Sequence, residues 1–226
     1  MKTVVVLSGA GISADSGLRT FRDEDGLWED HAIEDVATPE GFARNPQLVL
    51  DFYNARRRQL QAAQPNPGHD ALVQLEQRYQ VHVITQNVDD LHERAGSRHV
   101  LHLHGELNKL RSTGDAQHVI DWFEDQPRTL CDPQGAPMRP HIVWFGEAVP
   151  AMDEAEALVA HADVVLVIGT SLQVYPAAGL VHSAPAHAQV YLIDPHPVRG
   201  LHGVHVVAER AAVGVPRVVA ALLAAA

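Results

Sequence analysis

The stretch Val4-Val5-Val6-Leu7, followed by Gly9-Ala10-Gly11, decides the fold of this 226-residue chain. Four consecutive aliphatic residues predict a strand that is buried on both faces, as in a parallel sheet. The glycines allow a sharp turn and let backbone N–H groups approach a ligand closely. A strand, a glycine turn and a helix start together form an anion site, because the first helical N–H groups have no partner within the helix. The stretch therefore predicts a site for the pyrophosphate of a nucleotide.

The glycines do not form the Gly-x-Gly-x-x-Gly fingerprint of dehydrogenases, because Gly17 comes six residues after Gly11. An ordinary glycine turn that closes a βα unit is the alternative interpretation. In the segment that follows, Arg19 and Arg22 lie on either side of Phe21. This pattern suits a flap over a charged, planar ligand.

The formal net charge is −11 at pH 7, from 17 basic and 28 acidic residues. This balance argues against nonspecific nucleic-acid binding and against binding to an anionic membrane surface. Cys131 is the only cysteine, which excludes an intramolecular disulfide and indicates a reducing compartment. We find no signal peptide and no apolar run of the ~18 residues that a membrane span needs, so we expect a soluble, cytoplasmic protein. The sequence leaves the oligomeric state open.

Apolar strands alternate with helical stretches along the chain. The predicted strands are Thr3–Leu7, Val81–Thr85, Val164–Ile168, Val190–Ile193 and Val204–Val207. The predicted helices are Pro46–Gln61, Gly68–Tyr79, Met152–His161, Pro176–Ser183 and Val215–Ala225. This alternation predicts an α/β fold, a doubly wound, Rossmann-like parallel sheet with helices on both faces. The polar segment from Leu107 to Pro140 breaks the pattern and predicts a small additional lobe.

Polar or glycine motifs follow four of the five predicted strands. These motifs are Gly9-Ala10-Gly11, Gln86-Asn87-Val88-Asp89, Gly169-Thr170-Ser171 and Asp194. Because ligands bind at the carboxyl ends of parallel strands, we expect the motifs to meet at one site. For Asn87 and Asp89, a simple role in capping the next helix is the alternative.

The sequence Leu101-His102-Leu103-His104-Gly105 contains a candidate base. If it forms a short strand that Gly105 ends, His102 and His104 face the same side and His104 lies at a sheet edge near the nucleotide. A histidine there can accept a proton near neutral pH. The alternatives are a packed or solvated histidine, or a metal-binding pair, for which no further ligand stands at a useful spacing.

Seven motifs, in order and spacing, resemble those of the sirtuins, NAD-dependent protein lysine deacylases, and the likeness to the bacterial members covers nearly the whole chain. The motifs are Gly9-Ala10-Gly11-Ile12-Ser13 with Gly17, Thr20-Phe21-Arg22, Gly26-Leu27-Trp28, Thr85-Gln86-Asn87-Val88-Asp89, Leu103-His104-Gly105, Val143-Trp144-Phe145-Gly146-Glu147 and Gly169-Thr170-Ser171. The resemblance implies one catalytic domain over residues 1–226, with a large NAD-binding lobe (about 1–28, 66–106 and 142–226) and a small lobe (about 29–65 and 107–141).

The resemblance also implies residue roles. The implied cofactor contacts are Gly9, Ala10, Gly11, Ile12, Asp15, Thr20, Phe21, Arg22 and Trp28 in and near the flexible loop, Gln86, Asn87, Val88 and Asp89 around nicotinamide and its ribose, and Gly169, Thr170, Ser171, Asp194 and Ala211 on the adenosine side. His104 is the implied general base and Asn87 the second catalytic residue. The acylated lysine of a substrate protein would bind with its peptide added as a strand. The implied substrate contacts are Tyr53, Arg56, Val143, Phe145, Gly146, Glu147 and Val174.

In the implied reaction, the acyl oxygen of the substrate attacks the anomeric carbon as nicotinamide leaves. His104 then removes a proton from a ribose hydroxyl, and water releases lysine and acylated ADP-ribose. The alternatives that use the same cofactor pocket are an ADP-ribosyltransferase or NAD hydrolase, which would release nicotinamide without removing an acyl group, and a non-catalytic NAD-sensing module, which would need no base.

Tyr53 and Arg56 are three residues apart in a predicted helix and project from one face. They resemble the Tyr-x-x-Arg pair that lines the acyl pocket of sirtuins that prefer succinyl and malonyl lysine. Arginine binds a carboxylate through two parallel hydrogen bonds, and tyrosine can add a third. The alternative is a solvated basic helix face that includes Arg57 and Arg58.

The sequence departs from the sirtuin pattern in two places. Most sirtuins hold a structural zinc with four cysteines, but Ser112 stands where the first cysteine is expected. We therefore predict no metal and a zinc-free lobe, with a substitute site around His118 and Cys131 as the alternative. The predicted packing residues of this lobe are Leu107, Leu110, Val119, Trp122, Phe123 and Leu130. Asp194 stands where asparagine is usual; it can accept from both ribose hydroxyls and would repel a 2′-phosphate, which favours NAD over NADP.

Overall fold

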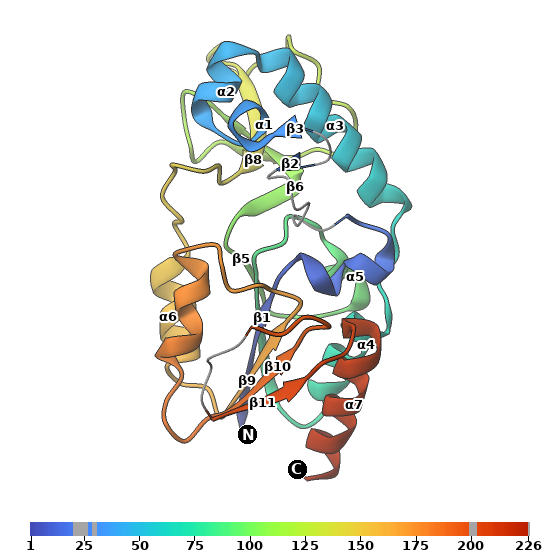
Figure 1. The fold of residues 1–226 in the computed structure, drawn as a ribbon. Coiled ribbons are helices and arrows are strands. Elements are labelled where there is room, and N and C mark those ends of the chain that lie inside the picture. Colours follow the sequence, from blue (N-terminus) through green and yellow to red (C-terminus); the bar gives the residue numbers. More distant parts are fainter. Residues whose placement is uncertain (20–26, 29–30, 199–202, 226) are drawn as a thin grey trace.

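A computed structural model describes residues 1–19, 27–28, 31–198 and 203–225 (Figure 1). Among these residues, the main sheet has six parallel strands in the order β11-β10-β9-β1-β4-β5. The strands are β1 (Thr3–Ser8), β4 (Gln80–Thr85), β5 (Val100–His102), β9 (Val164–Ile168), β10 (Gln189–Ile193) and β11 (Val204–Val207). This is the order of a doubly wound dinucleotide-binding sheet, with the topological switch point between β1 and β9. The predicted α/β, Rossmann-like fold is confirmed.

The unbroken apolar run of β1 places side chains in the cores on both faces of the main sheet. Val4 and Val6 pack into one core cluster, while Val5 and Leu7 pack into another. Helices α4 (Pro67–Leu75) and α7 (Ala211–Ala224) supply the first cluster, and helix α6 (Met152–Val159) and the 3-10 helix η3 (Ala177–Ser183) the second. Figure 1 shows these two pairs on opposite sides of the main sheet. A strand with helices on both faces has no polar side, which explains the absence of alternation.

The predicted helices differ from the observed ones mainly in three places, while Met152–His161 ends two residues earlier, at Val159. Helix α4 ends at Leu75 and not at Tyr79, whose hydroxyl donates to the Leu222 carbonyl at 2.9 Å. Helix α7 begins at Ala211, with Pro216 inside it, rather than at Val215. The predicted helix Pro176–Ser183 is a 3-10 helix.

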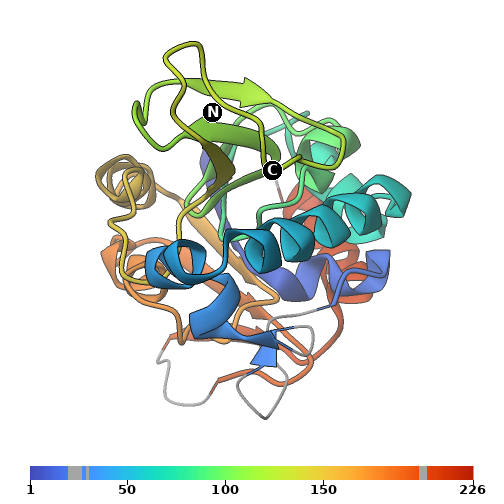
Figure 2. The same ribbon diagram turned by 90° about the horizontal axis from the view of Figure 1, so that it is seen from above.

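The upper part of the molecule in Figure 1 combines helices, among them the long α3, with antiparallel strands. Its elements are β2 (Leu27–Trp28), β3 (His31–Ala32), α1 (Ile33–Val36), α2 (Pro39–Arg44), α3 (Pro46–Ala62), β6 (Gly105–Ser112), β7 (Val119–Asp121) and β8 (Met138–Ile142). Strands β7, β6 and β8 form the small sheet, and Figure 2 shows α3 beside it. The remaining elements are the 3-10 helices η1 (Ala10–Ile12) and η2 (Ala14–Ser16) and helix α5 (Leu91–Ala95).

The small sheet only partly follows the predicted packing. Leu107 and Leu110 are buried as predicted, but 37% of Val119 and 55% of Phe123 are exposed. Val119 lies in β7, a three-residue edge strand, and Phe123 follows directly after that strand. The core beneath is instead supplied by α3 together with the ring of Trp144.

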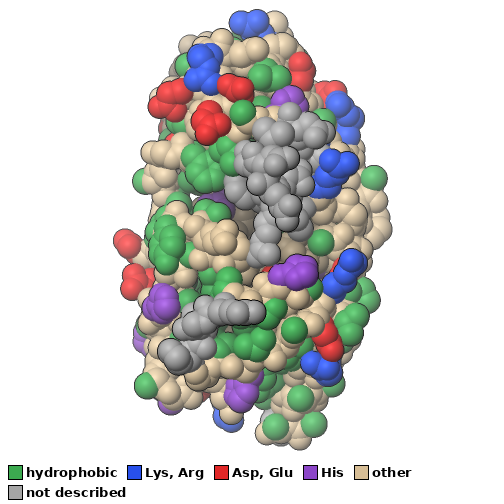
Figure 3. Space-filling model, viewed as in Figure 1, with side chains coloured by type: hydrophobic (Ala, Val, Ile, Leu, Met, Phe, Trp, Pro, Cys, Tyr) green, Lys and Arg blue, Asp and Glu red, His purple; other side chains and the backbone are tan. Residues whose placement is uncertain are grey.

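The surface carries charges of both signs. On the face in Figure 3, Lys and Arg side chains are scattered among Asp and Glu side chains rather than gathered in one basic patch. Within the described part of the chain, no helix has the length and apolar character required to cross a membrane.

Candidate functional site

A cavity of about 1120 Å³ lies between the carboxyl edge of the main sheet and the upper part of the molecule. The motifs after β1, β4, β9 and β10 all line it, as their positions predict. The predicted cofactor residues that line the cavity are Gly9, Ala10, Gly11, Asp15, Gln86, Asn87, Val88, Asp89, Gly169, Thr170, Ser171 and Asp194. His104 and all the predicted substrate residues, Tyr53, Arg56, Val143, Phe145, Gly146, Glu147 and Val174, line it as well.

Other predicted cofactor residues lie elsewhere. Ile12 and Ala211 are buried in the core below the site and do not line the cavity. Thr20, Phe21 and Arg22 lie outside the described residues, and of Trp28 only the backbone is described, paired with His31 in β3. Their roles stay predictions.

Glycines let the loops after β1 and β9 touch at the switch point. The N–H of Gly11 donates to the Gly169 carbonyl at 2.8 Å, and a Cβ on Gly11 would lie 2.5 Å from the Gly169 Cα. Gly169 has a φ of 58°, which L side chains rarely adopt. The predicted helix start after β1 is two 3-10 turns, so an anion there depends on backbone N–H groups and not on the dipole of a long helix.

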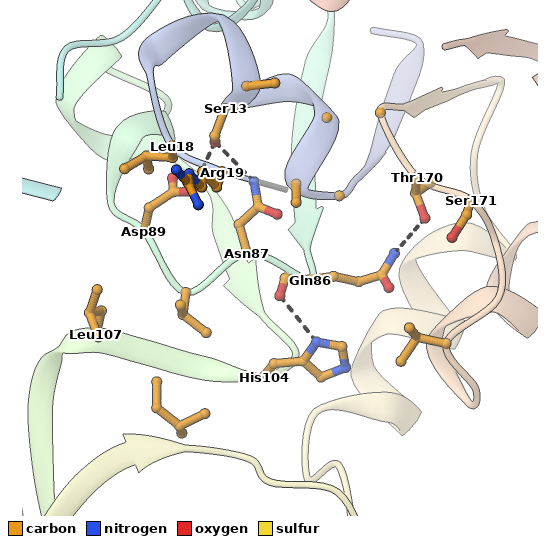
Figure 4. Close-up of a pocket in the computed structure, with 18 of the residues that line it drawn as sticks. Ser13, Leu18, Arg19, Gln86, Asn87, Asp89, His104, Leu107, Thr170 and Ser171 are labelled. Carbon is orange, nitrogen blue, oxygen red and sulfur yellow. Dashed lines mark hydrogen bonds between the residues drawn. The ribbon is translucent and has the colours of Figure 1, made fainter. Parts of the chain in front are cut away.

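Ser13, Asn87 and Asp89 form a buried hydrogen-bonded cluster on the cavity wall (Figure 4). The Ser13 hydroxyl donates to Asp89 Oδ2 at 2.9 Å, and Asn87 Nδ2 donates to Ser13 Oγ at 3.1 Å. Asp89 Oδ1 accepts from the N–H of Leu91 at 3.2 Å, so this carboxylate also supports the start of α5. Burial raises the pKa of Asp89, although the hydrogen bonds from Ser13 and Leu91 oppose the rise.

His104 has the geometry of a neutral base. Its Nδ1 lies 3.1 Å from the Gln86 carbonyl oxygen, which can only accept, so Nδ1 carries the proton. Nε2 is then unprotonated in the neutral ring, and Figure 4 shows the ring among the residues that line the cavity. Burial lowers the pKa of His104, and the Gln86 carbonyl only partly opposes this, so the neutral form prevails at pH 7. The Gln86 side chain donates to Thr170 Oγ1 at 3.1 Å and links the ends of β4 and β9.

His102 and His104 have different partners and different roles. The prediction of one strand that carries both histidines is wrong. Strand β5 ends at His102, and Gly105 begins β6 rather than ending β5. The ring of His102 contacts Glu93 Oε1 at 2.7 Å and the Asn87 carbonyl at 3.0 Å. Burial opposes the charged ring, but Glu93 outweighs this effect and the pKa of His102 is raised. The ring of His102 therefore links the backbone of Asn87 to Glu93, a role that the sequence did not indicate.

No group of three or more His, Cys, Asp or Glu side chains that could hold a metal ion occurs among the residues that the structure describes. Several cavity residues were not among the predicted site residues, and two of them form polar contacts with predicted ones. Ser13 belongs to the cluster above, and Arg210, which precedes α7, pairs with Asp15 at 3.1 Å. Both are distant in sequence from their partners, so spacing gave no signal for either contact.

Tyr53 and Arg56 lie on α3 at the other end of the cavity from the nucleotide loops. Tyr53 is fully buried, and its hydroxyl accepts a hydrogen bond from Trp144 Nε1 at 2.9 Å. Burial raises the pKa of Tyr53 above its ordinary value, so the phenol stays protonated. The guanidinium carbon of Arg56 lies 4.9 Å from the centre of the Phe52 ring.

Arg57 is fully buried, contrary to the expectation that it is solvated beside Arg58. Its guanidinium donates to the backbone carbonyls of Leu107 and Glu124, both at 3.1 Å, and to Asn54 Oδ1 at 2.8 Å. Burial lowers the pKa of Arg57 to about 10, which leaves it charged at neutral pH. Arg58 is exposed as expected.

The segment Val143–Glu147 forms a turn after β8 rather than a continuation of the strand. The N–H groups of Val143 and Phe145 donate to backbone carbonyls elsewhere in the chain, at 2.9 and 3.0 Å. The N–H of Trp144 donates to the Glu147 carboxylate at 2.8 Å, and Gly146 has a φ of 88°. A peptide that adds here as a strand would therefore pair mainly with carbonyls, and this binding mode stays a prediction.

The Sir2 family pattern matches residues 9–176. An NAD-dependent protein deacylase of Aggregatibacter actinomycetemcomitans is 61% identical over 200 residues, which cover 88% of this chain and 96% of that protein. Another of Bacteroides thetaiotaomicron is 53% identical, with 95% of each chain covered. The crystal structure of a Sir2 homologue–NAD complex is 39% identical and superposes with a TM-score of 0.90 over 99% of this chain and 90% of that one. The cavity at the switch point and these likenesses lead to one conclusion: the chain belongs to the Sir2 family.

Proposed function

We propose that this protein is an NAD-dependent protein lysine deacylase, which transfers the acyl group of a modified lysine to ADP-ribose and releases nicotinamide. The single observation that carries the proposal is the meeting of His104, Asn87 and Asp89 in one cavity that the Gly9–Gly11 and Gly169–Ser171 loops also line. Relatives of more than half identity, with nearly full coverage, carry this activity in their names. A binding-only module would not need a neutral histidine with Nε2 as its base.

The chemistry assigned to each residue follows from its partners. NAD binds with its phosphates at the glycine loops, and Asp194 accepts from the adenosine ribose, which excludes a 2′-phosphate by charge repulsion. After the acyl oxygen has displaced nicotinamide, His104 Nε2 removes the proton of a ribose hydroxyl, which then attacks the acyl carbon. A positioned base of this kind contributes roughly 10²–10⁴-fold in rate. Cofactor and substrate that together fill the cavity would keep bulk water from the sugar cation.

The Tyr53–Arg56 pair supports a preference for succinyl and malonyl lysine over acetyl lysine. Both side chains line the cavity from one face of α3. A carboxylate at the end of the acyl chain would receive two charge-assisted hydrogen bonds from Arg56 and one from the Tyr53 phenol. An acetyl group has no terminal carboxylate that could accept these hydrogen bonds.

We also propose that the small sheet needs no zinc. Ser112, at the position of the first expected cysteine, donates to Asp132 Oδ2 at 2.5 Å and accepts from two backbone N–H groups. Asp132 Oδ1 accepts from the N–H groups of Gln134 and Ala136. These bonds join the end of β6 to the 132–136 turn, as a metal would. Metal analysis that finds one zinc for each chain would contradict the proposal.

The activity is tested by incubating the protein with NAD and peptides that carry acetyl-, succinyl- or malonyl-lysine, followed by mass spectrometry. We expect loss of the acyl group with one nicotinamide and one acylated ADP-ribose formed for each lysine, and no turnover by His104→Ala. Nicotinamide release without acyl loss would instead identify an NAD hydrolase or an ADP-ribosyltransferase.

A further inference from the structure

Trp144 contacts Tyr53, part of the proposed acyl pocket, through one group and the charged side chain of Arg139 through another. Its ring is buried, and the indole Nε1–H donates to the Tyr53 hydroxyl oxygen at 2.9 Å. An indole N–H can only donate, so in this contact the phenol is the acceptor. The Tyr53 hydroxyl can therefore donate its own proton only to a different acceptor. A hydroxyl that accepts one hydrogen bond is polarised and becomes a stronger donor in its next one.

Arg139 and Glu147 hold the indole of Trp144 in place. The guanidinium carbon of Arg139 lies 3.3 Å from the centre of the Trp144 ring, as in a close cation–π contact. Glu147 accepts from both terminal nitrogens of Arg139, at 2.7 and 3.0 Å, and from Arg111 at 2.9 Å. The second oxygen of Glu147 also accepts from the backbone N–H of Trp144 at 2.8 Å. One carboxylate thus fixes both the backbone of Trp144 and the cation that covers its ring.

We propose that Trp144 is a positioning residue for acyl selectivity, because its N–H holds the Tyr53 phenol as a hydrogen-bond donor to the carboxylate of a succinyl or malonyl group. Arg139 and Glu147 keep the indole in place. Glu147 then acts through Trp144 and not as a direct contact of the peptide. This inference rests on the proposed carboxyacyl preference and assigns part of it to a residue outside the Tyr-x-x-Arg pair.

The test is a double-mutant cycle with succinyl-lysine and acetyl-lysine peptides. Trp144→Phe keeps an aromatic ring against Arg139 and removes the N–H donor together with part of the indole volume, so a control for lost packing is needed. We expect this change to lower kcat/KM for the succinyl peptide about 3- to 10-fold, the effect of one neutral hydrogen bond, and to change that for the acetyl peptide less than about 2-fold. In a Tyr53→Phe background, the same change should leave the succinyl-to-acetyl ratio as it is, because no hydroxyl remains to be oriented.

Phe42→Leu is the matched control. The Phe42 ring packs against the Trp144 ring, with centroids 5.3 Å apart, but it forms no hydrogen bond with Tyr53. A loss of packing alone should lower the melting temperature and leave the succinyl-to-acetyl ratio unchanged. A ratio that falls as much as it does in Trp144→Phe would overturn the inference.

The inference and the proposal beneath it fail in different ways. A native protein that treats both peptides alike overturns the carboxyacyl preference and this inference together. A native preference that survives Trp144→Phe, or that falls equally in the presence and absence of the Tyr53 hydroxyl, overturns only the role of Trp144. Should Trp144→Phe not fold, the indole N–H resonance of Trp144 provides the second measurement. We expect it to shift in Tyr53→Phe, and an unchanged resonance would overturn the inference.

Discussion

His104 and Gln86 meet through a side chain and a backbone atom, with His104 Nδ1 3.1 Å from the Gln86 carbonyl oxygen. Because this oxygen belongs to the backbone, no substitution at position 86 removes it. The same residue sends its side chain to Thr170. Gln86 therefore fixes the tautomer of the base with one group and connects two strand ends with another.

The pH dependence of the reaction should reflect the lowered pKa of His104. Burial disfavours the imidazolium, so the pKa lies below the ordinary value of 6.5. The neutral ring is the active form, so we expect kcat/KM to fall as the pH drops through the lowered pKa and to reach half of its plateau value only below pH 6.5. A pH–rate profile of the free protein under limiting substrate measures this. An acid limb centred above pH 6.5 would rule out the assignment.

Arg56→Met should act on the substrate carboxylate alone. Loss of a charge-assisted pair of hydrogen bonds costs about 1.5–3 kcal/mol, so we expect kcat/KM for a succinyl peptide to fall roughly 10- to 100-fold. The value for an acetyl peptide should change much less. Arg58→Met, two residues along on the exposed side of α3, is the control and should alter neither. Equal losses for both peptides with Arg56→Met would remove the basis for the acyl preference.

Arg57→Met should destabilise the fold. The change leaves the Leu107 and Glu124 carbonyls and the Asn54 side chain without their buried donor. A buried polar group that is left without its hydrogen-bond partner costs about 1–3 kcal/mol. We expect a markedly lower urea midpoint than for Arg58→Met, which breaks only an exposed ion pair. Matching midpoints would show that Arg57 contributes no more than its surface neighbour.

Gly11→Ala should also lower stability, because the new Cβ would lie 2.5 Å from the Gly169 Cα. Forcing a methyl group into a packed site costs about 1–3 kcal/mol. Gly179→Ala is the control, since the nearest atom to its added Cβ would be 3.9 Å away. Thermal unfolding in the presence and absence of NAD separates a loss of fold from a loss of cofactor binding. If Gly11→Ala lowers the melting temperature no more than Gly179→Ala does, the close approach of Gly11 to Gly169 is contradicted.

The sequence predicted best where structure is local and repetitive. Val164–Ile168 was placed to the residue, because a β-branched run between two helical stretches has one plausible use in an α/β chain. The small sheet was predicted poorly, since its packing depends on long-range contacts. The burial of Arg57 is decided by carbonyls that lie 50 and 67 residues further along the chain. The two histidines at 102 and 104 look equivalent by spacing, and only their acceptors, Glu93 and Gln86, distinguish them.

The backbone contact between Gly11 and Gly169 limits how the nucleotide pocket can be re-engineered. Neither position has room for a side chain, so no new charge or bulk can be introduced at the floor of the pocket. Altered cofactor preference must come from other lining positions, such as Asp194 and Arg210, which belong to the same cavity. A library directed at these two positions would vary recognition and leave the junction of the central strands intact.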